Sequence, residues 1–258
     1  MTVKTYSAWS YGHSITTNNN QLPFDEGSGE LVAQLNSGGY TIASLATEMA
    51  RSMNSVGTLN YTASVDRLTG LITISGDSNF DLLVTSSSLS AISAYEILGF
   101  TTERTGASTY DGDIRSGSYF EPQFLLQSYV DFVDNQSSNN VTVQESATGK
   151  VQVVKYGNVN IMECNITLQT NISQSRDSII KNDPAGYDNL LSFMQYATTK
   201  QPMEFYKDID DPENTFTDCI VEKTSADSKG TGFKLRELYS RGFADWWETG
   251  IISFRELT

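Results

Sequence analysis

The chain has 258 residues, with 17 basic and 31 acidic side chains, one His and a formal net charge of −14. This length predicts one large domain or two small ones, and the apolar content is sufficient to build a core. The composition excludes a disordered polyelectrolyte, a coiled coil and a membrane protein, and the scattered basic residues argue against tight binding to a nucleic-acid backbone.

The first half begins with a short strand and a helix. Apolar and polar residues alternate over 31–35, and the segment Asn36–Gly39 then breaks the strand. Thr41 is suited to cap a helix that runs to about Asn54, with Gly57 as its stop. One apolar stripe gives this helix a buried face, and it consists of Ile42, Leu45, Ala46, Met49 and Met53.

A hairpin and a second helix follow. Residues 59–65 and 70–75 alternate with period two and are separated by a turn-forming segment at 66–69, which predicts a β-hairpin. The apolar run 80–84 predicts a further short strand. A second helix is predicted over about 88–98, with Gly99 as its left-handed stop and an apolar stripe of Leu89, Ile92, Tyr95 and Leu98.

These elements predict a small α+β module in residues 1–116, with its core at about 20–102. Residues 101–118 are rich in turn formers and nearly free of large aliphatic side chains, so we place a linker and a domain boundary there. A second domain is then expected over 117–258.

The second domain is predicted to be a β-sandwich with one inserted helix. The helix is expected to begin at Asp183 and Pro184, with a buried face that includes Phe193. The predicted strands share period-two alternation or short apolar runs; they are 124–132, 141–143, 151–154, 159–168, 203–206, 215–222, 233–239 and 251–257. The expected fold class is therefore α+β and β-dominated.

Export and redox chemistry are not indicated. The segment Met1–Thr17 has no continuous apolar run, so no signal peptide is expected, and no stretch is long enough to span a membrane. Cys164 and Cys219 are therefore expected to be buried free thiols.

No catalytic, cofactor-binding or metal-binding residue is predicted. The only His, His13, lies in a polar segment ahead of the module core at about 20–102 and is expected at the surface. The chain has no nucleophile elbow, no phosphate-binding loop and no dinucleotide-binding glycine motif, and three Cys and His residues are too few for a structural zinc site.

Two acidic clusters are possible oxygen-rich sites for Ca²⁺, at Asp208–Glu213 and at Asp111 with Asp113. Neither follows a known calcium-loop spacing, and Asp is favoured in turns for backbone reasons, so solvated turns are the preferred interpretation. A glycosidase with two carboxylates is a distant alternative, which the sequence supports no better than chance because 31 acids always supply some pair.

Aromatic residues suggest either stacking platforms for sugars or contacts within a core or between subunits. The candidates for stacking are Tyr6, Trp9, Tyr11, Trp246 and Trp247. We favour core or subunit contacts for the aromatic residues near the C-terminus. The residues predicted as assembly contacts are Phe205, Phe243, Trp246, Trp247 and Phe254.

Residues 24–100 carry a succession of structural motifs. Phe24-Asp25-Glu26-Gly27 precedes the segment Gly38–Ala46, which contains Gly-Gly-Tyr-Thr and Leu45-Ala46. The hairpin Tyr61–Ile74 and the closing Leu98-Gly99-Phe100 follow. This order resembles a module that recurs in structural proteins of tailed bacteriophages and other large viruses. The second half is similar in style to minor and distal tail proteins, without a diagnostic motif.

The resemblance implies a non-enzymatic virion component, assembled in the host cytoplasm, that forms a homo-oligomeric ring in the tail or baseplate. Its partners would be copies of itself and other tail or baseplate proteins, and genomic DNA would pass without specific binding. Neither a cofactor nor a membrane is implied. A host-receptor or carbohydrate-binding virion protein, a head decoration protein and a neck connector are the alternatives.

Overall fold

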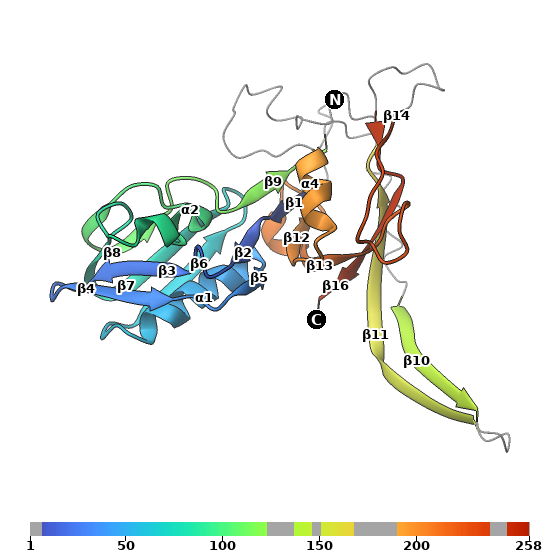
Figure 1. The fold of residues 1–258 in the computed structure, drawn as a ribbon, viewed down its shortest axis with the longest axis horizontal. Helices are drawn as coiled ribbons and strands as arrows, with labels where there is room; N and C mark the ends of the chain where they lie inside the picture. The colour runs from blue at the N-terminus through green and yellow to red at the C-terminus, as the bar shows by residue number, and fades with distance from the viewer. Residues whose placement is uncertain (1–6, 123–136, 146–150, 168–189, 238–246, 258) are drawn as a thin grey trace.

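The computed structural model describes residues 7–122, 137–145, 151–167, 190–237 and 247–257, with the backbone alone described for 137–145 and 151–159. Within these residues the fold is dominated by antiparallel strands and has few helices, which confirms the predicted α+β, β-dominated class. Figure 1 shows a module formed by the first half of the chain beside a second part that carries a long hairpin.

A seven-stranded antiparallel sheet forms the second part, which we call the sheet domain. In spatial order its strands are β10 (Ser137–Glu145), β11 (Val151–Asn165), β16 (Ile251–Glu256), β13 (Phe216–Lys223), β12 (Met203–Tyr206), β1 (Ala8–Tyr11) and β9 (Ser118–Phe120). A two-stranded sheet of β14 (Arg236–Glu237) and β15 (Trp247–Glu248) and the short helix α5 (Pro212–Thr215) also belong to this part.

The core of the sheet domain lies between one face of the sheet and helix α4 (Leu190–Ala197). Trp9 is at its centre, with ring centroids 5.1 Å from Phe193 of α4 and 5.0 Å from Phe205 of β12. Because side chains alternate along a strand, Met203 and Phe205 point into this core while Glu204 between them faces the opposite side. Each buried large apolar side chain contributes about 1.5–3 kcal/mol.

The first part is a module inserted between two adjacent strands of the sheet domain. β1 and β9 pair directly, Tyr11 opposite Ser118, and the chain between them forms the module. The division of the sequence at residue 117 therefore placed Ala8–Tyr11 with the wrong part, because β1 pairs with β12 and β9. The pairing of β1 with β12 joins residues about 200 positions apart, so a local sequence pattern does not reveal it.

The inserted module has its own sheet and core. Strands β3 (Gln21–Asp25), β4 (Glu30–Gln34), β6 (Tyr61–Asp66), β7 (Leu71–Leu82) and β8 (Arg104–Asp111) form an antiparallel sheet in which β7 is central, and β2 (His13–Ile15) pairs with β5 (Gly38–Tyr40). The helices are α1 (Ile42–Asn54), the 3₁₀ turn η1 (Ser90–Ile92) and α2 (Tyr95–Leu98).

Helix α1 confirms the prediction for this part of the sequence. Thr41 accepts a hydrogen bond from the backbone N–H of Ser44, and the Ser44 side chain accepts one from the backbone N–H of Thr41, which completes a capping box. The predicted apolar stripe is buried against the sheet of the module. The hairpin of β6 and β7 also forms as predicted.

Two expectations for the module were wrong. The predicted helix at 88–98 is interrupted at Ser93, which is extended and bridges Gln21 of β3. Ala94 also donates its N–H to the carbonyl of Gln21, at 2.9 Å, so that pairing with β3 replaces a helical turn. The predicted linker at 101–118 contains β8, an edge strand whose polar residues face water and whose Tyr110 is buried.

The strand predictions for the second half agree with the structure where it is described. β10 and β11 form the predicted hairpin, and β12, β13 and β16 match the predicted strands 203–206, 215–222 and 251–257. The predicted strand 233–239 is reduced to β14 within the described residues. The predicted strand 124–132 and the predicted helix start at Asp183 lie outside the described residues.

Replacing Thr41 with Ala removes the side-chain half of the capping box. We expect the free energy of unfolding to fall by about 1 kcal/mol, measured by urea denaturation followed by circular dichroism. Thr47→Ala is the matched control, since Thr47 is exposed in the middle of α1 and Ala favours helix. A loss as large in Thr47→Ala would contradict the role of the cap.

Candidate functional site

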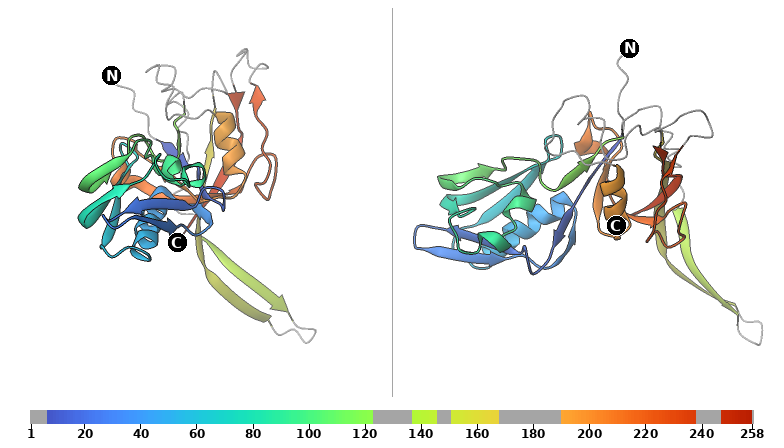
Figure 2. Two further views of the ribbon diagram at one scale, coloured as in Figure 1. Left: turned by 60° about the vertical axis from the view of Figure 1, so that its left-hand side comes forward. Right: turned by 45° about the horizontal axis from the view of Figure 1, so that its top comes forward.

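The β10–β11 hairpin continues beyond the sheet as a two-stranded ribbon. β10 pairs with residues 151–160 of β11, whereas β16 pairs with residues 161–165 of the same strand. Over 137–145 and 151–160 the outer backbone edges have no strand partner among the described residues. Figures 1 and 2 show the ribbon projecting from the sheet domain, away from the module and from the rest of the sheet, in all three views.

An isolated two-stranded ribbon is marginally stable in water, and its outer edges carry unpaired N–H and C=O groups. A register shift between Asn139 and Val141 adds a local irregularity that increases strand twist. The geometry therefore makes the ribbon suitable for pairing with another chain, by the addition of a strand to a free edge.

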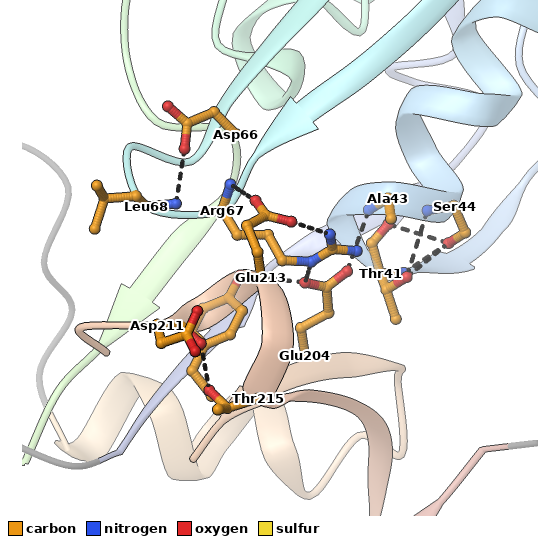
Figure 3. Close-up of polar contacts among 11 residues, drawn as sticks. Thr41, Ala43, Ser44, Asp66, Arg67, Leu68, Glu204, Asp211, Glu213 and Thr215 are labelled. Atoms are coloured by element: carbon orange, nitrogen blue, oxygen red, sulfur yellow. Dashed lines mark hydrogen bonds and ion pairs between the residues drawn. The ribbon is translucent and has the colours of Figure 1, made fainter. Parts of the chain in front are cut away.

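A second polar feature lies where the module meets the sheet domain. Arg67 in the β6–β7 turn donates from Nε to Glu204 Oε2 at 2.9 Å and from Nη1 to Glu213 Oε2 at 2.8 Å. Its backbone N–H also donates to Glu213 Oε1 at 2.8 Å. Figure 3 shows the guanidinium between the two carboxylates, one from β12 and one from α5.

Glu204 is fully buried, and the surrounding groups compensate its charge. Its Oε1 accepts the backbone N–H of Ala43 in the first turn of α1 at 3.4 Å, and its Oε2 accepts the hydroxyl of Tyr206 at 3.2 Å. The positive end of the α1 dipole favours a carboxylate at this position. The Arg67 guanidinium also lies over the ring of Phe216, 3.7 Å from its centroid.

Asp218 adds a further carboxyl to this junction. It lies opposite Glu204 in the β12–β13 register, and its Oδ1 is buried without a hydrogen-bond partner in the described residues. Burial, followed by the negative charge of Glu204, raises the pKa of Asp218 to about 6, although the charge of Arg67 lowers it. The junction therefore contains a carboxyl group whose pKa is well above its usual value.

Two of the residues predicted as assembly contacts are part of the core. Phe205 and Phe254 are 3% and 2% exposed and belong to the cluster around Trp9, so their side chains are not available to a neighbouring subunit. The prediction was wrong for these two residues, because both lie on the core-facing side of their strands. Trp247 is half-buried in β15, and Phe243 and Trp246 lie outside the described residues.

The predicted surface position of His13 was also wrong. His13 is fully buried, with Nε2 3.3 Å from the carbonyl oxygen of Ser116, and burial lowers its pKa to about 4. Trp9 and Tyr11, two candidates for sugar stacking, are 1% and 3% exposed and pack in the core. Tyr6 and Trp246 lie outside the described residues.

The acidic clusters take part in local contacts. In one cluster, Asp113 accepts hydrogen bonds from the backbone N–H groups of Thr101 and Thr102 and forms an ion pair with Arg104. In the other cluster, Glu213 forms an ion pair with Arg67. In the part of the chain that the structure describes, no group of three or more His, Cys, Asp or Glu residues is placed to hold a metal ion. Cys164 and Cys219 are buried free thiols, as predicted, and burial raises the pKa of Cys164 to about 12.

Arg67 and Glu204 were not predicted as site residues from the sequence. The available signal was a single charged residue, Glu204, within the otherwise apolar and aromatic strand Met203–Tyr206. A buried carboxylate of this kind requires a partner, but the pattern does not say which of 17 basic residues supplies it.

No protein-family model matches the sequence, and no curated protein matches it. Within the described residues, no helix has the length and apolar character needed to cross a bilayer.

Asp218 gives the junction a defined dependence on pH. Its folded-state pKa lies above the value of about 3.9 expected in the unfolded chain, so its stabilising effect is present below about pH 4 and is lost as the pH rises through 6. Between pH 5 and pH 8, we expect the free energy of unfolding of the wild-type chain to fall by about 1 kcal/mol relative to that of Asp218→Asn. The expected fall is this small because water partly screens the half-buried carboxyl group.

Urea denaturation of both proteins across this range measures the difference. Asp113→Asn is the control, because its hydrogen bonds and Arg104 hold the pKa of Asp113 below its usual value, and the difference from wild type is then flat above pH 5. An equally flat profile for Asp218→Asn would show that the carboxyl does not titrate in this window.

Proposed function

We propose that this chain is a non-enzymatic structural subunit that acts by assembling with copies of itself, and that the β10–β11 ribbon is its main self-association surface. The observation that carries this proposal is the pair of free backbone edges along 137–145 and 151–160. Monomeric proteins protect such edges, whereas subunits of an assembly pair them with neighbours.

We place the subunit in the virion of a tailed bacteriophage, in a tail or baseplate ring assembled in the host cytoplasm. The resemblance of residues 24–100 supports this placement, and its motif residues have structural roles. Glu26 accepts the hydroxyl of Tyr61 at 2.9 Å and the backbone N–H of Leu59 at 3.2 Å, which ties the first motif to the hairpin motif. Gly99 has a φ of +85° and ends α2.

The partners in this proposal are other copies of the chain and neighbouring tail or baseplate proteins. A net charge of −14 would disfavour adhesion of DNA phosphates to a ring lumen and allow a genome to pass without specific binding. The proposed assembly requires no cofactor. The burial of Trp9 and Tyr11 removes two of the side chains on which a sugar-binding role depended.

The ribbon can be shortened without disturbing the sheet. Removing residues 139–158 and joining Ser138 to Val159 through Asn-Gly retains the Ser138–Val159 pair and closes it with a favourable two-residue turn. We expect the wild-type chain to have a mass several times 28.5 kDa by size-exclusion chromatography with light scattering, and to form rings in electron micrographs. The shortened chain should remain folded and monomeric.

Two single substitutions refine this experiment. Successive N–H groups of a strand point alternately to the partner strand and away from it, so Val141→Pro and Thr142→Pro remove donors from opposite edges of β10. The variant that loses the N–H group on the edge of β10 facing away from β11 should fail to assemble while keeping the β10–β11 hairpin. A wild-type chain that stays monomeric at all concentrations, or a shortened chain that assembles normally, would overturn the proposal.

A further inference from the structure

The module and the sheet domain have separate hydrophobic cores. The buried apolar cluster of the module contains residues between Ile15 and Tyr110, and the cluster around Trp9 contains none of them. Each part therefore holds its own shape, and the described apolar clusters do not extend across the boundary. Domains whose interface lacks a shared apolar core commonly move relative to each other.

The chain crosses between the two parts twice, and each crossing is at a glycine with positive φ. Gly12 follows β1 with a φ of +89°, and Gly117 precedes β9 with a φ of +63°. The two crossings are adjacent, because Tyr11 pairs with Ser118 and a Cβ on Gly117 would lie 2.5 Å from the Tyr11 carbonyl oxygen. Such residues at the ends of elements absorb large backbone changes in known hinges.

Among the described residues, further contacts between the two parts lie at the same end of the module. Gly39, which pairs with Ser14 just beyond the first crossing, packs closely against Gln201 and Pro202. The strongest contact is the ion pair of Arg67 with Glu204 and Glu213, supplemented by the N–H of Ala43. Figure 3 shows that the module supplies the guanidinium and the sheet domain supplies both carboxylates.

We propose that residues 13–116 are a hinged unit that rotates about the Gly12–Gly117 pair, and that Arg67 is the latch that holds it against the sheet domain. Closing the latch removes Glu204 from water, which is favourable only while the guanidinium compensates its charge. Opening returns Glu204 to water and leaves both cores intact. This inference does not depend on self-assembly.

The test measures the distance between the two parts in single molecules. Fluorescent labels on Val56→Cys in the module and Ser228→Cys in the sheet domain occupy exposed positions, and the native thiols are buried. A large excess of unlabelled chain keeps every transfer intramolecular. In an Arg67→Met background we expect the ratio of open to closed molecules to rise at least about tenfold.

Arg51→Met is the matched control, because Arg51 pairs with Glu48 of the same helix inside the module and should leave the distribution unchanged. Glu213→Gln, which weakens only the more exposed side of the latch, should shift the ratio in the same direction by less. Hydrogen exchange of α1 reports whether the module stays folded. A distribution in Arg67→Met identical to wild type, or opening that occurs only together with loss of α1 protection, would overturn the hinge.

Discussion

The buried carboxylate of Glu204 is the interaction on which the arrangement of the two parts depends. A carboxylate without exposed surface loses several kcal/mol of hydration, so it is tolerated only beside compensating groups. Those groups come from three elements: the β6–β7 turn, which carries Arg67, the first turn of α1, and β12, which carries the hydroxyl of Tyr206. The β6–β7 turn, the capped start of α1 and the side-chain alternation of β12 must all be in place before this charge is compensated.

Much of the local structure could be predicted from the sequence, because it depends on neighbours within a few residues. The cap at Thr41, the turn between β6 and β7 and the strands β12 and β16 belong to this class. The interruption at Ser93 depends on a contact with Gln21, about seventy positions away. For the same reason the pairing of β1 with β12, and with it the inserted position of the module, was not predictable from periodicity.

The candidate site was less accessible to prediction, because its residues have ordinary local contexts. Arg67 lies in a polar turn and resembles any solvated arginine in the sequence, and its contacts with Glu204 and Glu213 distinguish it only in the structure. Phe205 and Phe254 were interpreted as contacts with other subunits, yet the face of the sheet to which they point is covered by α4 of the same chain. His13 was placed at the surface by its polar neighbours, but β2 carries it against the Ser116 carbonyl beside Gly117, where it is fully buried.

The continuity of β11 has a mechanical consequence. This strand runs without interruption from Val151, in the ribbon, to Asn165, beside the buried Cys164. A pull on the ribbon along its own axis would act on the five residue pairs between β11 and β16 as shear, loading their perpendicular hydrogen bonds together rather than one after another. Tension at the tip would therefore be carried by the sheet as a whole rather than by one hydrogen bond at a time.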